Sequence, residues 1–275
     1  AERIDEVLNM DISIKEAEEP THVEKTAGVL KFNHVGFTYP GSKEPAICDI
    51  DFTANPGQTT AIIGSTGCGK STIVNLIPRL YDVSEGRIRV GGVDVRDYDL
   101  NVLRDGVAMV LQKNLLFAGT IRENLRWGNP DATDAELEEA CRLAQADEFV
   151  RAFPDGYDTH IEQGGTNVSG GQKQRLCIAR ALLRKPKILI LDDSTSAVDT
   201  RTDAMIRAGF ASYIPATTKI IIAQRIASVE NADMILVMDN GRVVDIGRHA
   251  ELLERSPIYR EVYEQQSRGG EQDEA

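Results

Sequence analysis

The sequence predicts an α/β fold with a parallel β-sheet at its centre, and three observations carry the prediction. Aliphatic residues run without alternation through 187–191 and two later segments, as in strands buried on both faces of a parallel sheet. The segment 29–39 alternates between apolar and polar residues, as in a strand with one exposed face. A glycine-rich segment at 64–72 separates an apolar run from a helix-like pattern. The chain should therefore combine buried parallel strands with a smaller, half-exposed β-region.

The N-terminal elements are expected to form a small antiparallel sheet. A strand over 29–39 closes at the turn Tyr39-Pro40-Gly41. Strand patterns follow at 46–52 and 59–63, on either side of the turn Asn55-Pro56-Gly57. These strands would lead directly into the glycine-rich segment.

Apolar patterns and turn residues predict the remaining elements. Residues 131 to 134 offer capping groups for a helix that follows them. The expected elements are a hairpin over 86–95, a buried strand over 107–111, helices over 131–152 and 172–184, and buried strands over 187–191, 219–223 and 234–238.

The composition is that of an ordinary globular chain with an acidic surface. Of its 275 residues, 41% are hydrophobic and 27% are charged, and the net charge is −12. This charge disfavours nucleic acid as a partner, because phosphate backbones attract basic surfaces. Cys48, Cys68, Cys141 and Cys177 have no metal-type spacing, which is typical of reduced thiols in the cytosol. No apolar run reaches the ~20 residues that a membrane-spanning helix needs.

The two ends of the chain differ in character from its middle. Residues 1–27 are polar and acidic, and we interpret them as a linker from a preceding domain that this chain lacks. The folded domain is expected over 28–265. Residues 266–275 are expected to form a polar tail that frays.

The glycine-rich segment has the spacing of a phosphate-binding P-loop. Gly64, Gly69, Lys70 and Ser71 fit the pattern G-x-x-x-x-G-K-[ST] between a strand and a helix. Glycines let the loop curl so that its backbone N–H groups and the helix N-terminus face phosphate oxygens. Lys70 would reach the β- and γ-phosphates, and the Ser71 hydroxyl would bind Mg²⁺. The predicted nucleoside triphosphate site comprises Gly64, Ser65, Thr66, Gly67, Cys68, Gly69, Lys70, Ser71 and Thr72.

A carboxylate follows the buried strand at 187–191. Asp192 ends the run Ile188-Leu189-Ile190-Leu191, which has the pattern of a Walker B strand. Ligands of parallel α/β sheets bind at the carboxyl ends of the strands, where this carboxylate would emerge. Together with the P-loop, Asp192 is therefore predicted to hold Mg²⁺.

The segment Ser169-Gly170-Gly171-Gln172 distinguishes this chain from other P-loop proteins. With Val168 in place of the leading leucine, it resembles the signature Leu-Ser-Gly-Gly-Gln of the ATP-binding-cassette (ABC) ATPases. A serine hydroxyl and glycine N–H groups at a helix N-terminus can hold a γ-phosphate. In that family, this phosphate belongs to ATP bound by the opposite subunit. The resemblance extends over 28–265 and implies a P-loop NTPase core, an N-terminal antiparallel β-subdomain and a helical signature subdomain at about 113–180.

The resemblance also implies roles for single residues. Tyr39 matches the aromatic residue that stacks on adenine, although a strand-end position at a turn explains it equally well. Gln112 matches the Q-loop glutamine, which binds Mg²⁺ and water and senses the membrane domains. Asp199 closes a segment that looks like the D-loop. The segments 120–124 and 259–263 look like the exporter branch, in which a transmembrane domain precedes this domain in the same chain.

Two residues depart from the family pattern on the nucleotide face. The residue after the Walker B aspartate is Asp193, where the family has a glutamate that polarises the attacking water. Its side chain is shorter by about 1.5 Å, and a misplacement of ~1 Å can lower the rate by ~10²-fold. Gln224 replaces a switch histidine that contacts the γ-phosphate, and it cannot carry the imidazolium charge. The expected catalytic residues are therefore Lys70, Gln112, Asp193 and Gln224.

We therefore expect an ATP- and Mg²⁺-dependent ATPase domain of an ABC exporter, at the cytoplasmic face of a membrane. The two departures suggest one half of a heterodimer, which hydrolyses ATP poorly at its own site and completes a partner chain's site with its signature. A homodimer with slow hydrolysis and a non-motor module that dimerises on ATP are the alternatives. ABC ATPases that act on chromosomes or ribosomes are disfavoured, because no heptads separate Leu76 from Asn167 and a second P-loop is absent.

Overall fold

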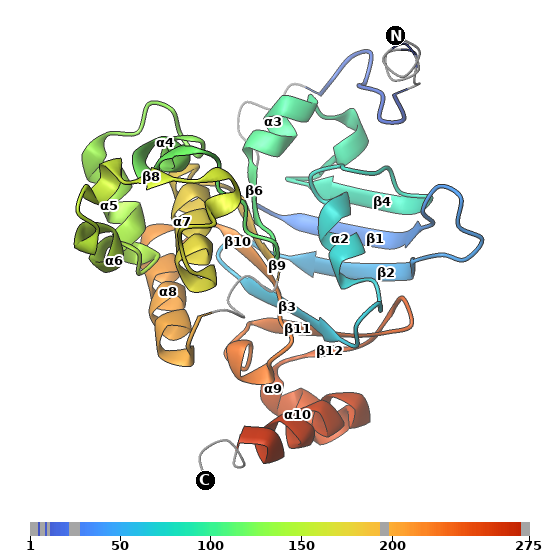
Figure 1. Cartoon of the computed structure of the whole chain (residues 1–275). Coiled ribbons are helices and arrows are strands. Elements are labelled where there is room, and N and C mark those ends of the chain that lie inside the picture. The colour runs from blue at the N-terminus through green and yellow to red at the C-terminus, as the bar shows by residue number, and fades with distance from the viewer. Residues whose placement is uncertain (1–4, 6–8, 10–11, 22–27, 193–197, 271–275) are drawn as a thin grey trace.

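A computed structural model describes residues 5, 9, 12–21, 28–192 and 198–270, and every structural statement below concerns these residues. The chain folds into a central β-sheet with a group of helices on one side and a second, antiparallel sheet on the other (Figure 1). Within the described residues, no helix has both the length and the apolar composition that crossing a membrane requires.

The central sheet has the strand order β12-β11-β3-β10-β9-β6. Its strands are β3 (Thr59–Gly64), β6 (Val107–Val110), β9 (Ile188–Asp192), β10 (Thr218–Ile222), β11 (Met234–Asp239) and β12 (Arg242–Gly247). All are parallel except β12, which lies antiparallel at one edge. The three aliphatic runs of the sequence are β9, β10 and β11, and most of their residues are buried, which explains why these runs lack polar alternation.

The second sheet is antiparallel and has the order β2-β1-β4-β5. It consists of β1 (Leu30–Phe37), β2 (Ile47–Ala54), β4 (Glu85–Val90) and β5 (Val93–Asp94). The expectation that residues 59–63 belong to this sheet is wrong, because β3 pairs with β10 and β11 in the central sheet. Residues 60–63 are all buried, so this strand needs a covering layer on both faces.

Short helices and one two-stranded pair complete the fold. The strands β7 (Gly119–Thr120) and β8 (His160–Ile161) pair with each other. The α-helices are α2 (Lys70–Leu76), α3 (Leu100–Asp105), α4 (Ile121–Arg126), α5 (Asp134–Leu143), α6 (Asp147–Ala152), α7 (Gly170–Leu183), α8 (Thr200–Tyr213), α9 (His249–Arg255) and α10 (Pro257–Gly270).

Residues 131–152 form two helices instead of the single one expected. The N-cap of α5 is Thr133, which forms a capping box with Glu136. After α5 ends, Gln145 adopts a left-handed conformation with φ 57°, which breaks the helix before α6 begins. The C-terminal end also differs from expectation, because α10 continues through residue 266 to Gly270 where a polar tail was expected.

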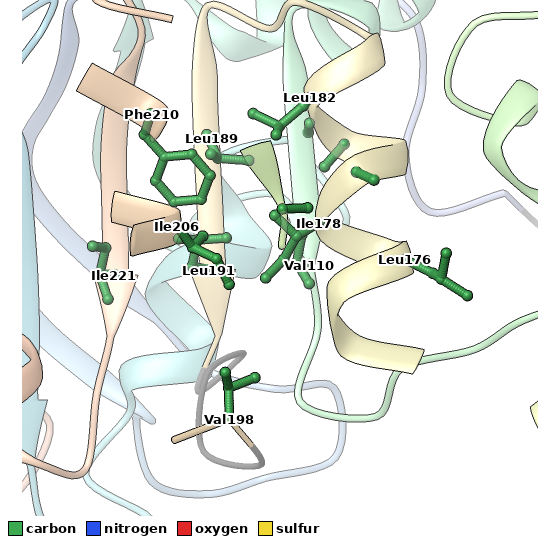
Figure 2. Packing of buried hydrophobic residues seen from close by; sticks show 14 of the residues in the cluster. Val110, Leu176, Ile178, Leu182, Leu189, Leu191, Val198, Ile206, Phe210 and Ile221 are labelled. Atoms are coloured by element: carbon green, nitrogen blue, oxygen red, sulfur yellow. The ribbon is translucent and has the colours of Figure 1, made fainter. Parts of the chain in front are cut away.

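Alternate residues of the central strands pack into two separate cores. Leu189 and Leu191 of β9 belong to the core with residues of α7 and α8, and Figure 2 shows Leu189 beside Phe210 and Leu191 beside Ile206. Ile188 and Ile190 belong to the other core, together with residues of α2 and of the antiparallel sheet. Each strand is therefore held from both faces, and the loops at its carboxyl end start from fixed positions.

Candidate functional site

The carboxyl ends of the parallel strands meet at one edge of the central sheet. In the strand register, Gly64 at the end of β3 lies beside Met238 of β11, and Asp192 at the end of β9 lies beside Ile222 of β10. A cavity of about 590 Å³ opens at this edge. This is where ligands of parallel α/β sheets bind.

Most residues of the predicted nucleotide site line this cavity. They include the P-loop residues 64–72 with the exception of Cys68, whose side chain is buried in the core beneath the loop. Four residues from other parts of the chain also line it, as expected: Tyr39, Gln112, Asp192 and Gln224. The structure therefore brings these predicted residues to one cavity, whereas Cys68 does not face it.

Two P-loop glycines are required by their backbone geometry. Gly69, which precedes α2, has φ 99°, and a Cβ there would lie 2.5 Å from the Cγ2 atom of Ile47. Gly64 has φ 152°, and a Cβ there would overlap the carbonyl oxygen of Met238. Both conformations favour glycine. The loop can therefore turn tightly against β2 and β11 and leave its outer surface to a phosphate chain.

Lys70 is held inside the P-loop. Its ammonium nitrogen Nζ donates to the carbonyl oxygens of Gly64 and Ser65, each at 2.7 Å, and lies 3.7 Å from Cys68 Sγ. These contacts hold the positive charge at the rim of the cavity. A triphosphate with its oxygens at this rim would face the ammonium group and the N-terminus of α2 together.

Ser71 and Asp192 form the predicted Mg²⁺ ligand pair. Burial raises the pKa of the Asp192 carboxyl, while a hydrogen bond from Ser71 and the charge of Lys70 act in the opposite direction. No group of three His, Cys, Asp or Glu side chains suited to a metal exists in the described part of the chain. This donor set fits Mg²⁺, which is often held by one or two protein oxygens together with substrate phosphates and waters. When bound, the ion would neutralise charge on the phosphates, and Gln112, the third residue expected to hold it, lines the same cavity.

Tyr39 stands at the entrance to the site from the antiparallel sheet. Its hydroxyl lies 3.1 Å from Thr72 Oγ1, and its ring meets those of Phe37 and Tyr81 edge to face, at centroid distances of 4.7 and 5.3 Å. The neighbouring rings fix the orientation of Tyr39 beside the cavity. Its position agrees with the stacking role implied by the resemblance, and also with its place just after β1.

Gln224 and Asp193 are the two expected departures. Gln224 follows β10 and lines the cavity, as the sequence predicts. Asp193 and the first two residues of the expected D-loop, 196–197, lie outside the described residues. The lining residues that sequence reasoning missed include Ile258 and Val262, which α10 brings from the far end of the chain. Their i, i+4 spacing indicated a helix face but not where that face would pack.

The signature residues are not brought to the cavity of their own chain. Ser169 is the N-cap of α7: its Oγ accepts from the Gln172 N–H at 3.2 Å, and the Gln172 side chain accepts from the Ser169 N–H at 2.9 Å. None of the four residues Ser169 to Gln172 lines the cavity. Asp199 similarly caps α8 by accepting from the Thr202 N–H, which lowers the pKa of its carboxyl. These residues face a different part of the surface.

A second cavity, of about 540 Å³, lies between α8, β10 and the segment 227–233. It contains Lys219, whose pKa is lowered by burial and whose ammonium donates to the carbonyl oxygens of Gly57 and Thr217. No described residue of the predicted site lines it. Of these two cavities, only the P-loop cavity is lined by residues that the sequence predicts to bind phosphate.

Comparison with known proteins agrees with this geometry. The family model described as ABC transporter matches residues 47–196, more than half of the chain. An uncharacterized ABC transporter ATP-binding protein of Mycobacterium tuberculosis is 45% identical over 271 residues, which cover 97% of this chain and 46% of that protein. The putative multidrug export ATP-binding/permease protein YgaD of Bacillus subtilis is 43% identical over 236 residues, 86% of this chain and 41% of that protein.

A solved structure of a bacterial Atm1-family ABC exporter with ATP bound has the same fold. It superimposes with a TM-score of 0.91 at 34% identity, over 96% of this chain and 47% of that chain. This chain thus spans about half the length of the curated relatives it matches. With its P-loop, Walker B strand and signature on this fold, the chain belongs to the ABC transporter family as an ABC-type ATPase domain related to those of exporters.

Proposed function

We propose that this domain is the ATP-driven motor of a membrane exporter. The observation that carries the proposal is the cavity in which P-loop, Asp192, Gln112 and Gln224 converge, and the export proteins among the relatives support it. In such a machine, ATP draws two domains together, and hydrolysis with phosphate release lets them part. The domain would work at the cytoplasmic face of the membrane.

An apolar cleft supports a transmembrane partner in the same full-length chain. Leu111, Leu115 and Trp127 are 48%, 56% and 64% exposed, and all three line a cleft of about 240 Å³ between β6 and α7. Clustered apolar side chains of this size are typical of an interaction surface. We assign the cleft to a segment of the transmembrane domain, since this chain spans about half the length of its relatives. Gln112 adjoins Leu111 in the chain, so a segment seated here would be coupled to the nucleotide cavity.

The signature segment supports a second nucleotide-binding domain as partner. Ser169 and Gly170 are exposed at the N-terminus of α7, away from the cavity of their own chain. A γ-phosphate presented by another subunit could accept from the free N–H groups there and from the Ser169 hydroxyl. We propose that this segment completes the ATP site of the partner domain.

We further propose that this chain's own site hydrolyses ATP slowly. Gln224 occupies the place at the end of β10 from which a switch histidine would contact the γ-phosphate. Asp193 offers a shorter side chain than the expected glutamate as the group that polarises water. A lost or misplaced general base lowers rates by ~10²–10⁴-fold, so the partner chain would supply the faster site.

The double substitution Asp193→Glu with Gln224→His tests this proposal. Steady-state ATP turnover of the chain should rise by about 10²-fold, because both catalytic groups are restored within a fold that already binds nucleotide. Adding Lys70→Ala to the restored chain controls for contaminating ATPases, since it removes the charge at the cavity rim and should abolish the gain. An unchanged rate in the restored chain would contradict the proposal.

Two other outcomes separate the alternatives. Brisk turnover by the unmodified chain alone would mean that Asp193 suffices and would favour a symmetric homodimer. ATP-dependent dimerisation without turnover, even after restoration, would favour a module in which ATP only holds two chains together.

A further inference from the structure

The C-terminal helix α10 contacts the backbone on both sides of the switch position. The Gln266 side-chain Nε2 donates to the carbonyl oxygen of Gln224 at 2.6 Å, and the Ile226 N–H donates to Gln266 Oε1 at 2.8 Å. One carboxamide therefore bridges the residue at the switch position and the residue two further along the chain. We infer that Gln266 is a positioning residue, which fixes where Gln224 stands in the nucleotide cavity.

The Ile226 N–H needs such a partner. The parallel register of β10 with β3 and β9 reaches Ile222, and the Ala223 N–H still donates to the carbonyl oxygen of Ile62. Ile226 is 1% exposed, and a buried N–H requires an acceptor. A glutamine carboxamide offers both N–H donors and a carbonyl acceptor, and Gln266 uses one of each for the backbone groups of Gln224 and Ile226.

The position of Gln266 on α10 follows from helix periodicity. Tyr259, Val262 and Gln266 are spaced at i, i+3 and i+7, which places them on one face of the helix. The first two are apolar contacts of this face: Tyr259 is fully buried, and Val262 packs against the core and lines the cavity. The third residue, Gln266, carries the carboxamide that bonds to the backbone of Gln224 and Ile226.

The near end of α10 is anchored to α9. The Tyr259 hydroxyl lies 2.7 Å from His249 Nδ1 of α9, and burial raises the pKa of Tyr259 to about 12. Gln266 lies two turns further along the same helix. The Tyr259 hydrogen bond holds α10 against α9, and the Gln266 bridge holds α10 against residues 224–226 beside the cavity.

The expected consequence concerns the γ-phosphate alone, and it rests on the proposed role of Gln224. With the bridge removed, the backbone at Gln224 loses one of its supports, so its side chain is placed less precisely and its contact with a γ-phosphate weakens. Contacts of ADP with the P-loop are unaffected, because Lys70 and the loop glycines are held by other bonds.

Affinities for Mg²⁺ with a non-hydrolysable ATP analogue and with ADP, measured by titration calorimetry on the full 275-residue chain, test this inference. Gln266→Ala should weaken binding of the analogue by about 3- to 10-fold and leave ADP binding unchanged. A weakening of this size is expected when one charge-assisted hydrogen bond forms less often. The matched control is Gln265→Ala, because Gln265 is the neighbouring residue and, among the described residues, its Nε2 donates to Glu261 of its own helix. It should change neither affinity.

Gln266→Glu adds a second variant of the same size. Its carboxylate keeps an acceptor for the Ile226 N–H but opposes the carbonyl oxygen of Gln224, so it should also lower the analogue-to-ADP preference. Equal weakening for both nucleotides in Gln266→Ala, or no change in either, would overturn the inference.

Gln224→Ala separates this inference from the proposed function. If Gln224→Ala lowers the preference for the analogue and neither Gln266 variant does, the bridge is wrong and the role of Gln224 stands. If Gln224→Ala leaves the preference unchanged, the proposed γ-phosphate contact is wrong, and the inference falls with it. In the double variant, Gln266→Ala should add little to the effect of Gln224→Ala, because both act through one contact.

Discussion

At the scale of single residues, Gly69 shows how the P-loop depends on backbone freedom. Its φ of 99° and its close approach to Ile47 leave no room for a side chain. Gly69→Ala should lower the free energy of unfolding by about 1–3 kcal/mol and weaken ATP binding, because the loop must shift to relieve both strain and overlap. Gly156→Ala is a matched control, since Gly156 has φ 52° but nothing lies within 4 Å of the added Cβ.

Chemical denaturation and nucleotide titration of the two glycine variants would measure the difference. The control should lose about 1 kcal/mol from backbone strain and keep its nucleotide affinity. Equal effects of the two substitutions on ATP binding would contradict the account of the loop.

His34 supplies a pH-dependent prediction away from the site. Its Nδ1 lies 2.7 Å from Asp49 Oδ1, and this hydrogen bond, followed by the charges of Asp49 and Asp51, raises the pKa of the imidazole. A raised pKa in the folded state means that protonated His34 stabilises the fold below its ordinary pKa. That contribution is lost as the pH rises through the higher, folded-state value. NMR titration of the imidazole should show the elevated pKa, and Asp49→Asn should lower it. A wild-type value at or below the ordinary one would contradict this assignment.

At the scale of secondary-structure elements, α5 and α7 are two of the four described helices that begin with a capping box. Ser169 with Gln172 caps α7, and Thr133 with Glu136 caps α5. Ser169→Ala and Thr133→Ala should each lower the free energy of unfolding by about 1 kcal/mol, measured by urea denaturation, because each leaves one helix N–H without its partner. A much larger loss for Ser169→Ala would show that Ser169 has a further structural role in its own chain. With similar losses, Thr133→Ala becomes a stability-matched control for tests of the signature.

The elements that the sequence predicted are those whose pattern is local. The aliphatic runs at β9, β10 and β11 are readable because both faces of each strand are buried. The assignment of β3 to the antiparallel sheet failed, because a turn between two strands suggests a hairpin and pairing partners far along the chain leave no local signal. The break at Gln145 was missed for a related reason: apolar periodicity continues across it, and a left-handed residue that is not glycine has no sequence signature.

The same distinction applies to the candidate site. The P-loop and Asp192 were found because each is a short continuous motif with its own chemistry. The wall formed by α10 and the bridge from Gln266 could not be found, since they reach the cavity only through packing of the C-terminal helix. From the sequence alone, a polar residue near the end of a chain, such as Gln266, is interpreted as part of a frayed tail, because its hydrogen-bond partners are not known.

At the scale of the whole molecule, the P-loop cavity and the exposed N-terminus of α7 lie on separate parts of the surface. The P-loop cavity binds this chain's nucleotide, and the exposed N-terminus of α7 is proposed to serve the nucleotide of another chain. This division predicts that two chains with different defects can complement each other, because one site needs the cavity of one chain and the signature of the other.

A complementation assay tests this central claim most directly. One chain carries Asp193→Glu, Gln224→His and Ser169→Ala, which restores its cavity and disables its signature; the other is the unmodified chain. Each alone should turn over ATP slowly, and their mixture should be faster than the sum by about 10-fold or more, since a restored general base alone is worth ~10²–10⁴-fold. Replacing the unmodified chain by its Ser169→Ala variant should remove the gain, whereas Thr133→Ala should preserve it. A mixture that only matches the sum of its components would contradict the claim.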